Sequence, residues 1–149
     1  MRWIIKSFEE LTTTELYGIL KLRNEVFIVE QNCPYEDCDN KDINSYHIFS
    51  MEGEAVKAYL RVVKKGVSYE DEVSIGRVVV NSECRRKGLA KDMLLIAINF
   101  VEKELNEKAI RISAQEYVLD LYRSIGFKEV SDIYLEDDIP HMEMLYLSK

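Results

Sequence analysis

The sequence predicts an α/β protein of the α+β kind, in which a mixed, mostly antiparallel central sheet carries helices on both faces. Three observations lead to this fold class. Runs rich in β-branched and aromatic residues form a hairpin meander over residues 46–80. Apolar stripes with helical spacing stand before the meander, at 12–31, and after it, at 89–101. A strand, a short helix and a final pair of strands follow, so the chain closes with crossovers that return to the sheet.

Length and composition fit one domain. The chain has 149 residues, and 47% of them are hydrophobic, which is enough for a sizeable core in a single domain spanning residues 1–149. The formal net charge of −7 disfavours a nucleic-acid partner. No apolar stretch is long enough to cross a bilayer and the N-terminus lacks signal-peptide features, so we expect a cytoplasmic protein without a membrane partner. The sequence leaves open whether the chain forms a homodimer.

The first elements are a strand, a helix and a long acidic loop. Residues 2–8 are predicted to form the strand, with Ile5 among its inward-facing side chains. The helix begins at a capping box, T-x-x-E, made by Thr12 and Glu15. Pro34 and a cluster of Asp and Asn residues mark the loop at 32–42. Because long loops in compact domains are often functional, this loop is a candidate part of the site.

The middle of the chain carries the meander and its exit. Strands are predicted at 46–51 and 55–63, with a hairpin turn at Glu52-Gly53-Glu54. The strand at 73–80 is a nearly continuous apolar run, which suits a strand buried on both faces. It passes through a polar turn into the amphipathic helix at 89–101.

The last elements return to the sheet. Residues 109–115 alternate between apolar and polar and are predicted to form a strand. A short helix is predicted at 117–125, with Gly126 in the position of its C-terminal cap. The final strands are expected at 127–130 and 142–147, joined by an acidic loop.

The turn that follows the strand at 73–80 has the features of a phosphate-binding site. We call it the phosphate turn, and its residues are Arg85-Arg86-Lys87-Gly88-Leu89-Ala90. The first turn of a helix has unpaired N–H groups and partial positive charge, so it attracts anions. Gly88 and Ala90 leave room for an anion at the backbone, and the three basic side chains add charge. Neither the P-loop nor the dinucleotide fingerprint is present, but the pattern R/Q-x-x-G-x-G/A is.

That pattern after an apolar strand resembles the acetyl-coenzyme A site of the GNAT superfamily of N-acetyltransferases, and the element order resembles the GNAT fold over nearly the whole chain. Segments 27–31, 33–37 and 139–141 are similar to the ElaA-like subgroup. The resemblance implies acetyl-coenzyme A as co-substrate, bound at the phosphate turn and at the backbone of one strand. There the strand is expected to separate from its neighbour, so that free N–H groups bind the pantetheine and polarise the thioester carbonyl. The residues implied are Val78, Val79, Val80, Arg85, Arg86, Lys87, Gly88, Leu89 and Ala90.

Tyr122 is the candidate catalytic acid. The segment from Leu121 to Phe127 is similar to the family's Tyr-x-x-x-Gly-Phe segment, whose tyrosine protonates the departing coenzyme A thiolate. A phenol suits this step, because it holds its proton at neutral pH and can pass it to a nearby sulfur anion. Most tyrosines on a helix flank simply pack with the hydroxyl in water, but the similarity of the segment favours the catalytic role.

Four side chains are candidates for contact with an amine substrate. His47 and His141 are the only groups whose ordinary pKa lies near neutrality, and Glu30 and Glu143 are carboxylate candidates. For each of them a structural role is an open alternative, and water can serve as the base. The acidic side chains of loop 32–42 either attract a cationic amine or are simply solvated.

The cysteines favour neither a disulfide framework nor a metal. Their number is odd and their spacing irregular, at Cys33, Cys38 and Cys84. The spacing C-x4-C with single distant histidines is a poor match to a zinc site, so we expect no metal cofactor. A covalent acetyl carrier at Cys84 is disfavoured, because no histidine is near it in the sequence.

These observations predict an acetyl-coenzyme A-dependent N-acetyltransferase. A primary amine of a small molecule or a protein would attack the thioester directly in a ternary complex. The alternative, from a different class, is a non-catalytic acyl-coenzyme A-binding sensor or regulatory module, which needs the phosphate turn but not Tyr122. The presence of Tyr122 favours the enzyme. The acceptor amine and the general base stay open.

Overall fold

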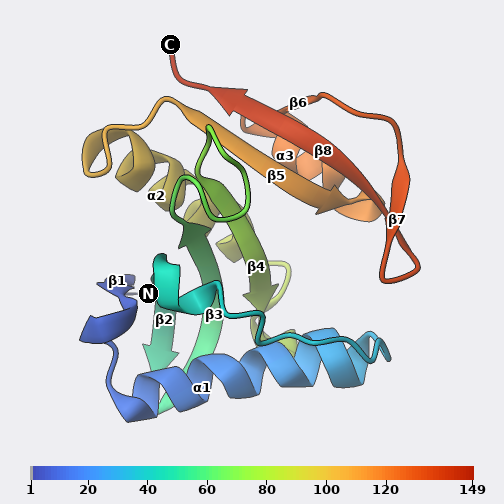
Figure 1. Cartoon of the computed structure of the whole chain (residues 1–149). Helices are drawn as coiled ribbons and strands as arrows, with labels where there is room; N and C mark the ends of the chain where they lie inside the picture. Colours follow the sequence, from blue (N-terminus) through green and yellow to red (C-terminus); the bar gives the residue numbers. More distant parts are fainter. Residues whose placement is uncertain (1) are drawn as a thin grey trace.

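The computed structural model describes residues 2–149 and contains two antiparallel sheets with helices on both faces (Figure 1). The first sheet has the order β1-β2-β3-β4, and the second the order β5-β8-β6, with β7 also paired to β8. The strands are β1 Ile4–Ser7, β2 Ser45–Glu52, β3 Ala55–Val63, β4 Ser74–Val80, β5 Ala109–Gln115, β6 Lys128–Glu129, β7 Tyr134–Glu136 and β8 Ile139–Leu147. The predicted fold class is confirmed.

Within residues 2–149, a single isolated bridge joins the two sheets. Val73 and Ile110 form an isolated parallel bridge, and the N–H of Arg111 donates to the carbonyl of Val73 at 3.0 Å. Beyond this bridge, no ladder joins β4 to β5 in residues 2–149, and the two strands diverge in Figure 1. Their facing edges therefore leave backbone groups without a sheet partner, as expected from the sequence.

Helices cover the first sheet on both faces. Helix α1, Thr13–Arg23, packs on one face, and α2, Leu89–Lys103, packs on the other. Successive strand residues point to opposite faces. Accordingly, Ile48 of β2 belongs to the core beneath α2, while its neighbour Phe49 belongs to the core beneath α1. Helix α3, Leu119–Ser124, packs into the same core as α2. None of the helices in residues 2–149 is both long and apolar enough to cross a lipid bilayer.

Helix α1 begins at a capping box and continues into a π-helical segment. The Thr12 hydroxyl accepts from the N–H of Glu15 at 3.1 Å, and the Glu15 carboxylate accepts from the N–H of Thr12 at 2.8 Å, which is the predicted capping box. The helix continues beyond Arg23, but residues Asn24–Glu30 form a wider π-helical segment, η2. Its N–H groups bond five residues back, as from Gln31 to Val26 at 3.0 Å. Segments of this kind are frequent at functional sites.

Two local predictions are wrong. Ile5 is 38% exposed, because its neighbours Trp3 and Ile4 supply the side chains that pack against the two cores. The acidic stretch before β8 is also more than a loop, since Tyr134–Glu136 forms β7, which pairs with the start of β8. Both residues of the connecting turn, Asp137 and Asp138, have positive φ angles of 52° and 62°. The turn is thus a tight hairpin made without the usual Asn-Gly or Asp-Gly sequence.

Gly126, which follows α3, is a position where only glycine fits. Its φ angle is 109°, and a Cβ placed there would lie 3.1 Å from the ring of Tyr146. We expect Gly126→Ala to lower the free energy of unfolding by about 1–3 kcal/mol, measured by thermal unfolding. Gly53→Ala is the matched control, because Gly53 also has a positive φ, 63°, but a Cβ there meets nothing within 4 Å. Equal losses in the two variants would show that the contact with Tyr146 costs nothing.

Candidate active site

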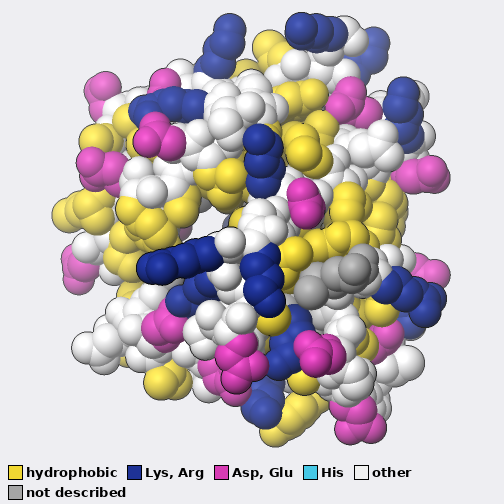
Figure 2. Space-filling model, turned by 180° about the vertical axis from the view of Figure 1, so that it is seen from behind, with side chains coloured by type: hydrophobic (Ala, Val, Ile, Leu, Met, Phe, Trp, Pro, Cys, Tyr) yellow, Lys and Arg dark blue, Asp and Glu magenta, His cyan; other side chains and the backbone are white. Residues whose placement is uncertain are grey.

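A cavity of about 750 Å³ occupies the opening between β4 and β5. This volume lies within the range of small-molecule sites. The cavity is lined by η2, by loop 32–42, by the β7–β8 turn and by Arg85, and also by Tyr122, which belongs to the core beneath α2. Figure 2, which views the molecule from behind, shows it hollowed near its centre, with hydrophobic side chains around the hollow and lysine or arginine side chains beside it.

The phosphate turn presents an open helix N-terminus. Gly88 is the N-cap of α2 in the left-handed conformation, with φ 74° and ψ 15°, and no side chain caps the helix. A Cβ at Gly88 would meet nothing within 4 Å, so the backbone is open to a ligand there. Helix α2 has 15 residues, long enough for a full macrodipole. This geometry fits the pyrophosphate of a coenzyme A thioester. Arg86 and Lys87 are exposed beside it, and Leu89 and Ala90 form the first turn of α2.

Arg85 connects the phosphate turn to η2. Its guanidinium lies 2.7 Å from the carboxylate of Glu30 and donates to the carbonyl of Val80 at 3.1 Å. The predicted substrate residue Glu30 therefore lies at the phosphate turn. The pair is exposed, with 39% of the Arg85 side chain and 45% of the Glu30 side chain accessible to solvent.

A β-bulge shapes the strand that borders the cavity. Tyr59 of β3 pairs with Val79 of β4, but Arg61 pairs with Gly76, so β4 carries one extra residue. Arg77 lies in the bulge with a φ of 53°. Bulges bend a strand and increase its twist, which accounts for the divergence of β4 from β5. Val78 is the second residue of the bulge, Val79 and Val80 follow it, and all three line the cavity.

Tyr122 lies on α3 and lines the cavity. It is 7% exposed, and its ring packs edge to face against Phe127, with 5.6 Å between the ring centroids. Burial raises the pKa of the Tyr122 phenol, and the nearby Tyr117 adds to the rise. The phenol therefore keeps its proton at neutral pH. Its hydroxyl makes no side-chain hydrogen bond within residues 2–149 and is not among the buried unpaired polar atoms, so it is open to the cavity. The Tyr122 hydroxyl therefore keeps its proton and does not donate it to another described group of the protein.

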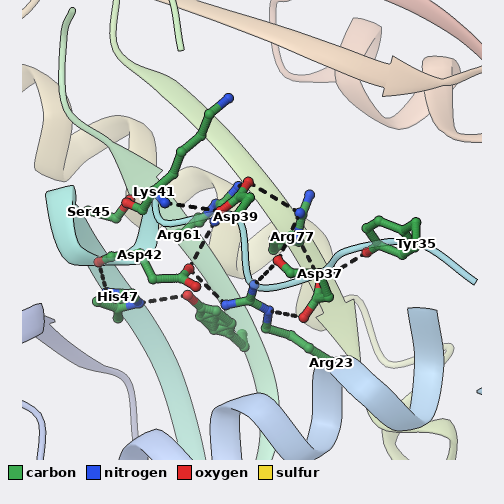
Figure 3. Close-up of polar contacts among 11 residues, drawn as sticks. Arg23, Tyr35, Asp37, Asp39, Lys41, Asp42, Ser45, His47, Arg61 and Arg77 are labelled. Atoms are coloured by element: carbon green, nitrogen blue, oxygen red, sulfur yellow. Dashed lines mark hydrogen bonds and ion pairs between the residues drawn. The ribbon is translucent and has the colours of Figure 1, made fainter. Parts of the chain in front are cut away.

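Loop 32–42 is held against the first sheet by a buried set of charges, which we call the Arg–Asp network (Figure 3). Arg23 of α1 lies 2.9 Å from Asp37 and 2.8 Å from Asp42. The other ion pairs are Arg61–Asp39 at 2.7 Å, Arg61–Asp42 at 2.9 Å, Arg77–Asp37 at 2.8 Å and Arg77–Asp39 at 3.3 Å. Three arginines thus meet three aspartates. The loop is fixed by this network beside the β4 bulge.

The two histidines have different surroundings. His47 is fully buried and lies between the hydroxyl of Tyr59, at 2.6 Å, and the carbonyl of Asp42, at 2.9 Å. Burial lowers its pKa, so the ring is neutral, and it does not line the cavity. His141 does line the cavity. Glu143 does not line the cavity. Its carboxylate lies 2.9 Å from the guanidinium of Arg111 instead.

Sequence analysis did not single out several polar side chains at the cavity. Arg77, Ser113, Tyr69 and Glu136 all line it. Of these, only Ser113 could have been identified from the sequence, because the alternation along 109–115 places the polar residues on the face opposite the apolar ones. Arg77 and Glu136 depend on the bulge and on β7, which the sequence did not predict.

The fold is that of the acyl-coenzyme A N-acyltransferases. The crystal structure of such an acyltransferase from Pseudomonas aeruginosa superposes with a TM-score of 0.91 and 38% identity, covering 98% of this chain and 99% of that one. Within this class, the chain belongs to the GNAT family, because the family described as acetyltransferase (GNAT) domain matches residues 13–147.

Two relatives place the chain more closely. The ElaA protein of Escherichia coli is 34% identical over 146 residues, covering 97% of this chain and 95% of ElaA. Its crystal structure gives a TM-score of 0.90 at 32% identity, over 98% of this chain and 99% of ElaA. A UPF0039 protein of Schizosaccharomyces pombe is 40% identical over 147 residues, covering 97% and 95% of the two chains. The similarity to the ElaA-like subgroup is confirmed, and family and neighbours support an acyltransferase role.

Proposed function

We propose that the protein is an acetyl-coenzyme A-dependent N-acetyltransferase that transfers the acetyl group to a primary amine by direct attack in a ternary complex. The observation that carries the proposal is the arrangement around one cavity. Val78–Val80 and the Tyr122 ring line this cavity, and the uncapped α2 N-terminus follows the lining residue Arg85. A non-catalytic sensor needs the Val78–Val80 backbone and the α2 N-terminus to bind the coenzyme. It does not need the protonated phenol of Tyr122, which has no hydrogen-bond partner among the described residues.

Each part has a separate task in the proposed reaction. The N-terminus of α2 and the basic side chains of the phosphate turn bind the pyrophosphate. The unpaired backbone of β4 binds the pantetheine and polarises the thioester carbonyl. The amine nitrogen attacks the carbonyl carbon, a C–N bond forms and the C–S bond breaks. Tyr122 gives its proton to the leaving sulfur, the nitrogen releases one proton to a base, and solvent returns the proton to Tyr122.

Binding of acetyl-coenzyme A tests the site assignment directly. We expect saturable binding in calorimetry, and we expect Gly88→Leu to weaken it by roughly tenfold or more, because the side chain enters the space that the phosphate needs at the helix N-terminus. Gly53→Leu is the control: it introduces a side chain at a similar positive φ, in the β2–β3 turn and outside the cavity lining. Equal affinity in the two variants contradicts the assignment.

Release of free coenzyme A with a panel of primary amines separates the two functions. The enzyme hypothesis predicts turnover with at least one amine. Tight binding of acetyl-coenzyme A without turnover of any amine favours the sensor.

A further inference from the structure

The second sheet carries a polar surface on the face opposite α2, and part of this surface lines the cavity. Alternate strand residues share a face, and Ile112 of β5 and Met144 of β8 point into the core beneath α2. Their neighbours Ser113 and Glu143, which are register partners, therefore point the other way. Further members of this surface are Arg111 of β5, Tyr134 and Glu136 of β7, and His141 of β8.

This surface carries more negative than positive charge. Arg111 is shared by two carboxylates, with Glu72 at 3.1 Å and Glu143 at 2.9 Å. Glu136 is a third carboxylate, without a lysine or arginine partner in residues 2–149, and it lies 3.5 Å from Nε2 of His141. Burial raises the pKa of Tyr69, which packs over Arg111, to about 12, with Glu143 and Glu136 contributing. Across the cavity, the Arg–Asp network pairs three arginines with three aspartates, so the network itself adds no net charge to the cavity.

His141 is held in a fixed orientation beside Glu136. It is 6% exposed, and its Nδ1 lies 2.7 Å from the carbonyl of Ile139. A carbonyl can only accept, so Nδ1 carries the proton in the neutral ring, and Nε2 has a lone pair. Nε2 is the nitrogen that faces Glu136. The ring also stacks on Tyr134, at 6.2 Å between centroids, and the Tyr134 hydroxyl bonds to Ser113.

We propose that Glu136 and His141 form the acceptor subsite for a small cationic amine, in which the Glu136 carboxylate binds the ammonium group and Nε2 of His141 removes its proton. The inference rests on the proposed function and names the substrate class. The N–H bond of the ammonium breaks, an Nε2–H bond forms, and the nitrogen lone pair becomes free to attack the thioester. The imidazolium that results donates Nε2–H to Glu136 and Nδ1–H to the carbonyl of Ile139. Its positive charge and the negative charge of the Glu136 carboxylate therefore compensate each other. The proton then passes to solvent.

The surroundings of the subsite favour a slender amine. Cys33, in loop 32–42, has its Sγ 3.8 Å from the carbonyl of Asp137, in the β7–β8 turn. Both residues line the cavity, and they belong to two different segments, loop 32–42 and the β7–β8 turn, so their contact narrows access on this side. An aliphatic ammonium chain passes such a restriction more easily than a folded protein surface does. The titratable groups that face the ring are Glu136 and Tyr134 of β7, and β5 contributes only the uncharged Ser113 and Gln115.

Two conservative variants separate the roles. His141→Asn keeps an amide N–H for the carbonyl of Ile139 but removes Nε2; Glu136→Gln keeps the shape and removes the charge. The probes are n-butylamine, which is cationic, and β-alanine, which also carries a carboxylate. In wild type, we expect a preference for n-butylamine over β-alanine. We expect Glu136→Gln to raise the KM for n-butylamine about tenfold or more and to reduce the preference, with the KM for acetyl-coenzyme A unchanged.

We expect His141→Asn to lower kcat by roughly 10²-fold or more. Glu129→Gln is the matched control, because Glu129 is a carboxylate of the same sheet, on β6, paired with Arg123 outside the cavity lining. Wild-type values in both test variants would overturn the subsite. Binding of acetyl-coenzyme A without acetylation of either probe would overturn it as well, while the cofactor site stands. If acetyl-coenzyme A does not bind, it is the proposed function that fails.

Discussion

Replacement of Tyr122 by phenylalanine is expected to lower turnover by roughly 10²-fold or more and to leave the affinity for acetyl-coenzyme A unchanged. The ring of Tyr122 is buried against Phe127, and the variant keeps that contact. The hydroxyl makes no side-chain hydrogen bond within residues 2–149, so its removal leaves no partner unsatisfied. Only the proton donor is lost. A thiolate with a pKa near ~8.5 can leave unprotonated at some cost, so activity is reduced rather than abolished.

Steady-state kinetics measure the turnover, and a binding titration measures the affinity for acetyl-coenzyme A. A fall in kcat with unchanged cofactor affinity marks an interaction that exists only in the transition state. Tyr17→Phe serves as the control, because Tyr17 is 72% exposed on α1 and does not line the cavity. Full activity in Tyr122→Phe would remove Tyr122 from the mechanism and assign the proton to water.

The largest effect on stability is expected from Arg23→Met, which should lower the free energy of unfolding by about 3–5 kcal/mol. Arg23 is fully buried and pairs with both Asp37 and Asp42. Removing it leaves two buried carboxylates short of positive charge. Urea unfolding measures the loss. Lys21→Met, which breaks the exposed pair with Glu25, is the control and should change stability by less than about 1 kcal/mol. Similar losses would show that burial adds nothing to the Arg–Asp network.

The same variant should change the response to acid. Burial by itself would raise the pKa of Asp42, but the guanidinium groups of Arg23 and Arg61 outweigh it, and the net pKa is lowered. A carboxylate with a depressed pKa stabilises the fold above its unfolded pKa, near ~3.9, and the contribution is lost as the pH falls through the lower, folded value. Arg23→Met removes part of that depression. We therefore expect its acid unfolding to begin at a higher pH than in wild type.

The sequence was sufficient for those parts of the fold that local patterns determine. The capping box of Thr12 and Glu15 and the apolar run of β4 depend on neighbouring residues, and both are found as predicted. The phosphate turn could also be located, because a helix N-terminus without a side-chain cap and with Gly88 at a positive φ has a recognisable sequence.

Features that depend on contacts between distant segments could not be predicted. Arg23 and Arg61 are 38 positions apart in the numbering yet share Asp42, and nothing local distinguishes them from surface arginines. The bulge at Arg77 shows only in its pairing with β3. The pairing of Glu136 with His141 requires the two-aspartate turn between β7 and β8, a turn sequence that few hairpins use.

The separation of the two sheets also bears on aggregation. Unpaired strand edges recruit other chains, and proteins protect themselves by keeping exposed edges short. The outer edges here are short, with four residues in β1, two in β6 and three in β7. The longer unpaired edges belong to β4 and β5, with seven residues each, and they face each other inside the molecule. The arrangement that leaves backbone groups free for a ligand thus also keeps them away from other polypeptides.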